Sequence, residues 1–211
     1  MEPSREATLR QVNPRVLIAL AVAGVLALGT VVLAAGRDDT RGASGPLRFE
    51  GATLPGGLRA PELRSVRTQD GRRLTMRALR GRPVIVTFLY TTCRDTCPAQ
   101  AQQIKGALNE LGRPVPAIAI AVDPPRDNPE RARTFLAKQR MTGRMDFLLG
   151  SRRALRRLWD AYAVQPQRDD LEHTARLVVV DPKGVQRVSF PLDQLTPERL
   201  AHDVRLLAAG H

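Results

Sequence analysis

The chain has 211 residues, with 33 lysines and arginines against 21 acidic residues and a formal charge of +12 at pH 7. Arginines recur along nearly the whole chain, without the dense tract or interleaved aromatics typical of nucleic-acid binders, so we expect no nucleic-acid partner. Arginines are concentrated at one place in the sequence: Arg152, Arg153, Arg156 and Arg157. On a helix this cluster would lie opposite an apolar stripe, so we interpret it as a solvent-exposed face. A basic outer surface suits an anionic membrane or an acidic partner.

A short N-terminal tail, residues 1–15, precedes an uncharged apolar run, residues 16–35. At about 1.5 Å per residue, a helix of this length spans roughly 30 Å, the hydrocarbon thickness of a bilayer. The run is longer than the apolar core of a cleaved signal peptide, about 7–15 residues, so we expect a transmembrane anchor. Cleavage after Ala34-Ala35 is the alternative. Arginines flank both ends equally and do not orient the segment.

An apolar segment ahead of a long domain is most simply an export signal that stays in place. The sequence therefore predicts a single-pass protein of the cell membrane whose C-terminal domain is extracytoplasmic, in a compartment that permits disulfides. Residues 36–61 are rich in Gly, Pro, Arg and Asp and lack periodicity, which predicts a flexible linker. Residues 62–211 are enough for one domain.

Hydrophobic periodicity and turn residues predict the elements of this domain. The predicted strands are residues 63–68, 72–75, 84–90, 117–122, 147–149, 176–181 and 185–190. Asp70-Gly71 joins the first two as an N-terminal hairpin. A helical turn is predicted at residues 76–80 and a helix at residues 98–111. Asn128 is expected to cap the next helix, which Pro129 begins, and Ser151 to cap a helix over residues 155–162. The last predicted helix begins at Thr196.

Cys93 and Cys97 are the only cysteines, and they stand between the strand 84–90 and the helix 98–111. Both sulfurs should lie at the mouth of this strand-to-helix turn, on the same side. A helix N-terminus favours the thiolate, the form that binds metals and exchanges disulfides. Their Cα atoms, four residues apart on a helix, are roughly 6.2 Å apart, within the range of a disulfide. The pair is a soft metal site, a redox couple or both; a plain structural disulfide is the alternative.

The order of elements predicts an α/β protein with a thioredoxin-like fold and an added N-terminal β-hairpin, preceded by one transmembrane helix. In that fold the loop before the late hairpin faces the cysteines, and in thioredoxins it presents a cis-proline. This chain has His173 there, between Glu172 and Thr174, and no proline. Cys93, Cys97 and His173 make a set of two sulfurs and one nitrogen. Thiolates favour Cu(I) and zinc, and imidazole suits copper in either common oxidation state.

These residues resemble the Sco/SenC family of copper proteins over roughly residues 63–190. The resemblance rests on three blocks: residues 87–98 with the cysteines, residues 121–129, and His173 with the strand and turn that follow it. It implies a membrane-anchored, extracytoplasmic chaperone that binds copper, as Cu(I) and also as Cu(II), through Cys93, Cys97 and His173. It also implies a partner, the copper-bearing subunit of cytochrome c oxidase, to which the protein delivers copper or whose cysteines it reduces. The family usually has proline at Arg94, whose charge should favour thiolate.

Other functions use the same cysteines. A thiol-disulfide oxidoreductase would attack with Cys93 and resolve with Cys97, and it would not need His173. A peroxidase of this fold is disfavoured, because the threonine and proline that peroxiredoxins place before the reactive cysteine are absent. A zinc site with an open water position is the remaining alternative, but no general base is evident beside it.

Several neighbouring residues have structural interpretations. Asp123 and Asp127 are expected to cap and order their loop, with a contact to the metal site as the alternative. Met141 and Met145 are expected to fill a loop or core edge rather than to supply thioether ligands. Trp159 and Tyr162 are expected in the core, and the remaining histidines, His202 and His211, are given no role.

Overall fold

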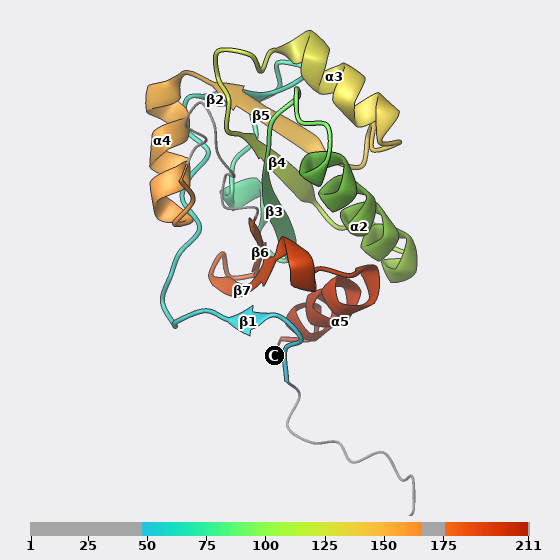
Figure 1. The fold of residues 1–211 in the computed structure, drawn as a ribbon. Coiled ribbons are helices and arrows are strands. Elements are labelled where there is room, and N and C mark those ends of the chain that lie inside the picture. The colour runs from blue at the N-terminus through green and yellow to red at the C-terminus, as the bar shows by residue number, and fades with distance from the viewer. Residues whose placement is uncertain (1–47, 166–175, 211) are drawn as a thin grey trace, which may run out of the picture. The chain divides into compact units, whose positions relative to one another are not determined.

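The computed structural model describes residues 48–165 and 176–210, which fall within one compact unit, Pro46–His211. Its described strands form one sheet in the order β1-β7-β6-β3-β4-β5-β2 (Figure 1). The strands are β1 (Ala52–Thr53), β2 (Val66–Thr68), β3 (Val84–Leu89), β4 (Ala117–Ala121), β5 (Asp146–Gly150), β6 (Arg176–Val180) and β7 (Gln186–Pro191). The helices are η1 (Arg77–Leu79), α2 (Thr96–Leu111), α3 (Pro129–Lys138), α4 (Arg152–Ala161), η2 (Leu192–Gln194) and α5 (Pro197–Ala208).

The centre of the sheet is parallel: β3 pairs with β4, and β4 with β5, in parallel register. β6 lies antiparallel to β3 and forms the predicted hairpin with β7. Helices α2, α3 and α5 lie on one face of the sheet and α4 on the other (Figure 1). This two-sided cover explains why β3 is buried at all six positions, as central parallel strands are. The mixed α/β thioredoxin-like architecture predicted from the sequence is confirmed.

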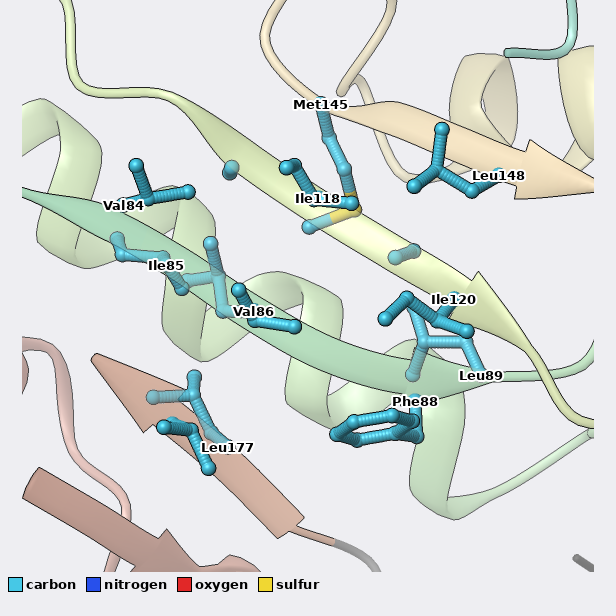
Figure 2. Packing of buried hydrophobic residues seen from close by; sticks show 14 of the residues in the cluster. Val84, Ile85, Val86, Phe88, Leu89, Ile118, Ile120, Met145, Leu148 and Leu177 are labelled. Atoms are coloured by element: carbon cyan, nitrogen blue, oxygen red, sulfur yellow. The ribbon is translucent and has the colours of Figure 1, made fainter. Parts of the chain in front are cut away.

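The core fills both faces of β3 and β4. Figure 2 shows side chains of these strands packed against each other and against their neighbours, among them Phe88 of β3, Ile120 of β4 and Leu177 of β6, which are fully buried. Burying a side chain of this kind stabilises the fold by about 1.5–3 kcal/mol. The buried cluster runs from Leu63 to Leu207. The unit Pro46–His211 therefore carries a hydrophobic core of its own, and we expect it to fold independently.

The three predicted helix caps are confirmed, whereas α2 begins at Thr96, two residues before the predicted start at residue 98. The Asn128 side chain accepts a hydrogen bond of 2.9 Å from the N–H of Arg131, and Pro129 begins α3. Ser151 caps α4 in the same way, and Thr196 caps α5 ahead of Pro197. Each cap satisfies a backbone donor that the helix itself leaves unpaired.

The predicted N-terminal hairpin is wrong. Its turn forms, with Gly71 at φ +74° and the Gly71 N–H donating to the carbonyl of Thr68 at 2.9 Å. However, residues 72–75 form no strand, and β2 pairs with β5 instead. Two constraints explain this. The edge of β5 needs a partner for its backbone groups, and Met76, 5% exposed, draws the chain after the turn into the core.

The ordered domain starts earlier than the predicted boundary at residue 62. β1 pairs with β7, and Arg59 forms a bridge with Val185 further along the same edge. The Ala60 N–H donates to the carbonyl of Gly184 at 2.9 Å. Backbone pairing of this kind needs no hydrophobic periodicity, so the sequence pattern does not reveal it. The predicted anchor, residues 16–35, lies outside the described residues; within residues 48–165 and 176–210 no helix is long and apolar enough to cross a bilayer.

The contact between α2 and α5 depends on a glycine. A Cβ at Gly106 would lie 2.7 Å from Cγ of Pro197. Alanine gains about 1 kcal/mol in helix propensity, but overpacking costs about 1–3 kcal/mol. We expect Gly106→Ala to lower the free energy of unfolding of the chain 46–211, measured by urea denaturation. The double variant Gly106→Ala/Pro197→Ala should regain most of the loss; a single variant more stable than wild type would contradict the steric account.

Candidate functional site

The two cysteines lie where the buried strand β3 passes into α2. The Cys93 N–H donates to the carbonyl of Tyr90 at 3.3 Å, which closes a tight turn directly after the strand. Cys93 is half-buried, and Cys97, in the first turn of α2, is fully buried. Neither cysteine forms a disulfide. The predicted position of the pair at a strand-to-helix turn is confirmed.

The sulfur of Cys93 takes the place of a helix cap. Asp95 stands at the N-cap of α2 but makes no side-chain capping hydrogen bond. Instead, the Cys97 N–H donates to Cys93 Sγ at 3.2 Å, and the Thr96 hydroxyl lies 3.4 Å from the same sulfur. The positive end of a helix favours negative charge at this point. The turn is therefore built to hold a thiolate at Cys93.

The two thiols differ in acidity. A hydrogen bond from the Cys97 side chain is the largest influence on Cys93, and hydrogen bonds from Thr96, the Cys97 N–H and Tyr90 add to it. Together they lower the pKa of Cys93 to about 4, although partial burial opposes the shift. The pKa of Cys97 is raised, first by its hydrogen bond to Cys93 and second by burial. At neutral pH, Cys93 is thus the thiolate of the pair and Cys97 its proton-bearing partner.

Asp127 ties a second loop to the cysteine turn. Its Oδ1 accepts hydrogen bonds from the N–H and the hydroxyl of Thr91, at 2.7 and 2.8 Å. Its Oδ2 accepts one from the N–H of Asp123 at 3.1 Å. Asp127 is 8% exposed, and burial raises its pKa against these hydrogen bonds. The expectation that Asp123 and Asp127 order their loop is confirmed, and Asp127 also fixes the backbone two residues before Cys93.

The third predicted ligand, His173, lies outside the described residues, so its position relative to the cysteines stays a prediction. Among the residues that the structure describes, no group of three or more His, Cys, Asp and Glu side chains is placed to hold a metal ion. Met141 and Met145 are buried at 0% and 2% exposure, as core residues rather than ligands of this turn. His202 lies on α5, with Nδ1 2.9 Å from a carboxylate oxygen of Asp203.

The expected influence of the Arg94 charge on Cys93 stays a prediction. The Arg94 side chain is exposed and makes no hydrogen bond or ion pair within residues 48–165 and 176–210. The hydrogen bonds of Cys97, Thr96 and Tyr90 lower the pKa of Cys93. A hollow of about 850 Å³ is unrelated to the cysteines, because it is lined by residues such as Leu79 and Pro116 that precede β3 and β4, at the opposite edge of the sheet.

Sequence reasoning missed the contacts that shape the turn. The Thr91–Asp127 pair joins two loops 36 residues apart, and the roles of Thr96 and Tyr90 depend on the rotamers of the folded turn. A hydroxyl residue directly before the second cysteine was the available signal for Thr96.

An α/β sheet with two thiols at the start of a helix defines a thioredoxin-like dithiol protein. Residues 65–209, more than half of the chain, match the model of the SCO1/SenC family. The chain therefore belongs to the SCO1/SenC family.

Relatives of the chain agree with this assignment. A protein of Stutzerimonas stutzeri whose name proposes copper binding is 28% identical over 144 residues, which cover 64% of this chain and 70% of that protein. The structure of Bradyrhizobium japonicum ScoI with copper bound is 28% identical, with a TM-score of 0.58, over 74% of this chain and 98% of that one.

A third relative supports the fold alone. BsSco, described as a member of the Sco family of cytochrome c oxidase assembly proteins with a disulfide switch, has a TM-score of 0.59 at 21% identity, over 79% of this chain and 98% of that one. In both structures 98% of the solved chain matches only 74–79% of this one. The matched part is therefore a domain that exists by itself in the relatives, which supports independent folding of the unit Pro46–His211.

The asymmetry of the two thiols predicts selective alkylation. At pH 6, iodoacetamide should modify Cys93 of the reduced chain 46–211 well before Cys97, because the lowered pKa keeps Cys93 a thiolate and Cys97 is buried. Peptide mass spectrometry over a time course measures both rates. In the control Cys93→Ser, Cys97 should stay slow at this pH. Equal rates in the wild type would refute the asymmetry.

The Asp127 anchor gives a second prediction. Asp127→Ala leaves three donors without their acceptor and should destabilise the chain 46–211 by about 2 kcal/mol or more. Amide hydrogen exchange at Thr91 should accelerate beyond the global change. Asp127→Asn keeps one acceptor oxygen and should lose less. Unchanged exchange at Thr91 in the alanine variant would mean that other contacts hold the turn.

Proposed function

We propose that this protein is a membrane-anchored, extracytoplasmic copper chaperone that assists assembly of the copper centre of cytochrome c oxidase. The observation that carries the proposal is the pair Cys93 and Cys97, two sulfurs in hydrogen-bonding contact at the start of α2 in a chain of the SCO1/SenC family. The copper-bound ScoI of B. japonicum and the assembly role stated for BsSco support extending this function to the chain.

The donors suit copper as cargo. Two sulfurs on one turn favour a soft cation, and Cys93 is already biased towards thiolate. His173 would supply the third donor, an imidazole nitrogen. If His173 stands on a second loop, as the sequence predicts, copper could pass to an acceptor by stepwise exchange of ligands. The hydrogen bonds of Asp127 to Thr91 would keep the cysteine turn in one conformation while ligands change.

Localisation follows from the sequence rather than from the described residues. The apolar run at residues 16–35 supports a single membrane anchor with the cysteine-bearing domain outside the cytoplasm. Copper centres that face that compartment would then be within reach of the domain, and the cysteine pair would be open to oxidation there.

The second candidate is a thiol-disulfide oxidoreductase, which the unequal acidity of the two thiols favours. The Cys93 thiolate would attack a disulfide of the partner, forming a mixed disulfide and releasing one partner thiol. Cys97 would then attack Cys93 Sγ, releasing the second partner thiol and leaving the Cys93–Cys97 disulfide. The partner gains two electrons and the protein loses two, so an external thiol reductant must restore it. The disulfide switch described for BsSco lends support.

Anaerobic Cu(I) competition against a chromophoric chelator tests the metal proposal on the reduced chain 46–211. The wild type should bind one copper per chain. His173→Ala and Cys93→Ser should each weaken binding by at least about tenfold, because each removes one donor. His202→Ala is the matched control, since its imidazole faces Asp203 on α5, and it should bind as the wild type does.

The same variants separate the two candidates. If His173→Ala holds copper as tightly as the wild type, while reduction of a disulfide-bonded oxidase copper domain requires both cysteines, the oxidoreductase function replaces the chaperone. If His173→Ala loses copper but still reduces the disulfide at the wild-type rate, the protein has both activities and the histidine serves only one.

A further inference from the structure

The exposed side of α4 carries four arginines that the proposed function does not use. We name this surface the α4 arginine face; it comprises Arg152, Arg153, Arg156 and Arg157. None of the four side chains makes a hydrogen bond or ion pair with any residue in 48–165 or 176–210. The opposite side of the helix is core, where Leu155, Leu158 and Trp159 are at most 2% exposed. The arginines thus face solvent without partners in the described chain.

Their placement opposes the electrostatics of the helix. Arg152 and Arg153 occupy the first turn, where the helix dipole disfavours cations. Arg156 and Arg157 follow four residues later, which sets like charges side by side. Two other helices obey the usual rule: α3 has Glu130 and α5 has Glu198 in the first turn, whereas α4 has no acidic residue there. Folding alone does not account for the arrangement. Local rules of this kind are typically broken where a site serves a partner.

The α4 arginine face begins at the edge of the sheet that carries the cysteines. β3, β4 and β5 are parallel, so their C-terminal ends share one edge. The cysteine turn follows β3, and Arg152 follows β5 after the single cap residue Ser151. Two strand spacings separate the ends of β3 and β5, roughly 10 Å. Figure 1 shows α2 and α4 starting at the same end of the sheet. A protein that reaches Cys93 would also cover the start of α4.

We propose that the α4 arginine face, together with the exposed Arg94, is the docking surface for an acidic face of the acceptor protein. The inference rests on the proposed function, because it assumes an acceptor that must approach the cysteines. A protein is the occupant that fits the position of this face, because its first arginines lie at the sheet edge that carries the cysteines, where the acceptor must approach. Charge complementarity would speed and orient the encounter.

Charge reversal tests the docking surface. The probe is the soluble copper-accepting domain of a cytochrome c oxidase subunit, apo and reduced, titrated against the copper-loaded chain 46–211 by calorimetry at low and at physiological salt. Arg152→Glu/Arg153→Glu should weaken binding by about tenfold or more and flatten its salt dependence. The matched control, Arg82→Glu/Arg113→Glu, has the same charge change before β3 and β4, at the opposite edge, on exposed arginines that make no hydrogen bond or ion pair with the described residues. It should change binding by less than about threefold.

Two further measurements exclude a structural explanation. Glutamates in the first turn of α4 agree with the helix dipole, so the melting temperature of the α4 variant should match or exceed that of the wild type. Its copper content should also stay at one per chain. Weaker docking with unimpaired stability and copper binding is the expected result, and a merely structural role for the arginines would not produce it.

The remaining outcomes overturn the proposal. Equal losses in both variants would mean a non-specific charge effect, and no loss in either would mean that α4 takes no part. Reduced binding to phosphatidylglycerol vesicles with unchanged binding of the domain would assign the face to the membrane. A wild type that binds no copper would defeat the proposed function itself, whereas a copper-loaded wild type indifferent to the α4 charges would defeat only the docking surface.

Discussion

The parallel pairing of β3 with β4 and of β4 with β5 is the constraint on which the site depends. Parallel strands end at the same edge, so the cysteine turn, the loop of Asp123 and Asp127, and the start of α4 are brought together although they are far apart in sequence. A slip of one residue would move every side chain of β3 to the opposite face, and because both faces are buried and closely packed, it would disrupt the packing on each. Asp127 then joins two of the three loops through its hydrogen bonds to Thr91.

This arrangement explains how one pair of thiols suits two chemistries. The sulfur of Cys93 stands where a helix normally has an oxygen cap, and the hydrogen bonds that it receives there stabilise a thiolate. A thiolate is both a soft ligand and a nucleophile, and the neighbouring Cys97 can be the second ligand or the resolving thiol. The geometry of the described turn is therefore compatible with both copper binding and disulfide exchange. A third donor would distinguish the two functions, because only copper binding needs one.

Local signals in the sequence were sufficient for most of the fold. The apolar run of β3, the caps Asn128, Ser151 and Thr196, and the position of the cysteines each depend on residues within a few positions of one another. The failures are non-local. Asp70-Gly71 specifies a turn but not which strand pairs beyond it: β2 pairs with β5 rather than with residues 72–75. The Thr91–Asp127 contact likewise joins loops whose proximity exists only in the folded sheet. His173 could be proposed only from fold and family resemblance.

Two helix starts at the cysteine edge, those of α2 and α4, depart from the local rules that α3 and α5 follow. α3 and α5 begin with an Asn or Thr side-chain cap and a first-turn glutamate, as an isolated helix would prefer. α2 instead begins with a sulfur in the capping position, and α4 with two arginines that its own dipole disfavours. Beside them Asp127 is a buried carboxylate whose pKa burial raises. The first-turn arginines of α4 cost stability that acidic residues there would recover, whereas the three hydrogen bonds that Asp127 accepts offset the cost of its burial. α3 begins at the same edge with an ordinary cap, so the departures belong to the starts of α2 and α4 themselves, where the proposed metal site and the proposed docking surface lie.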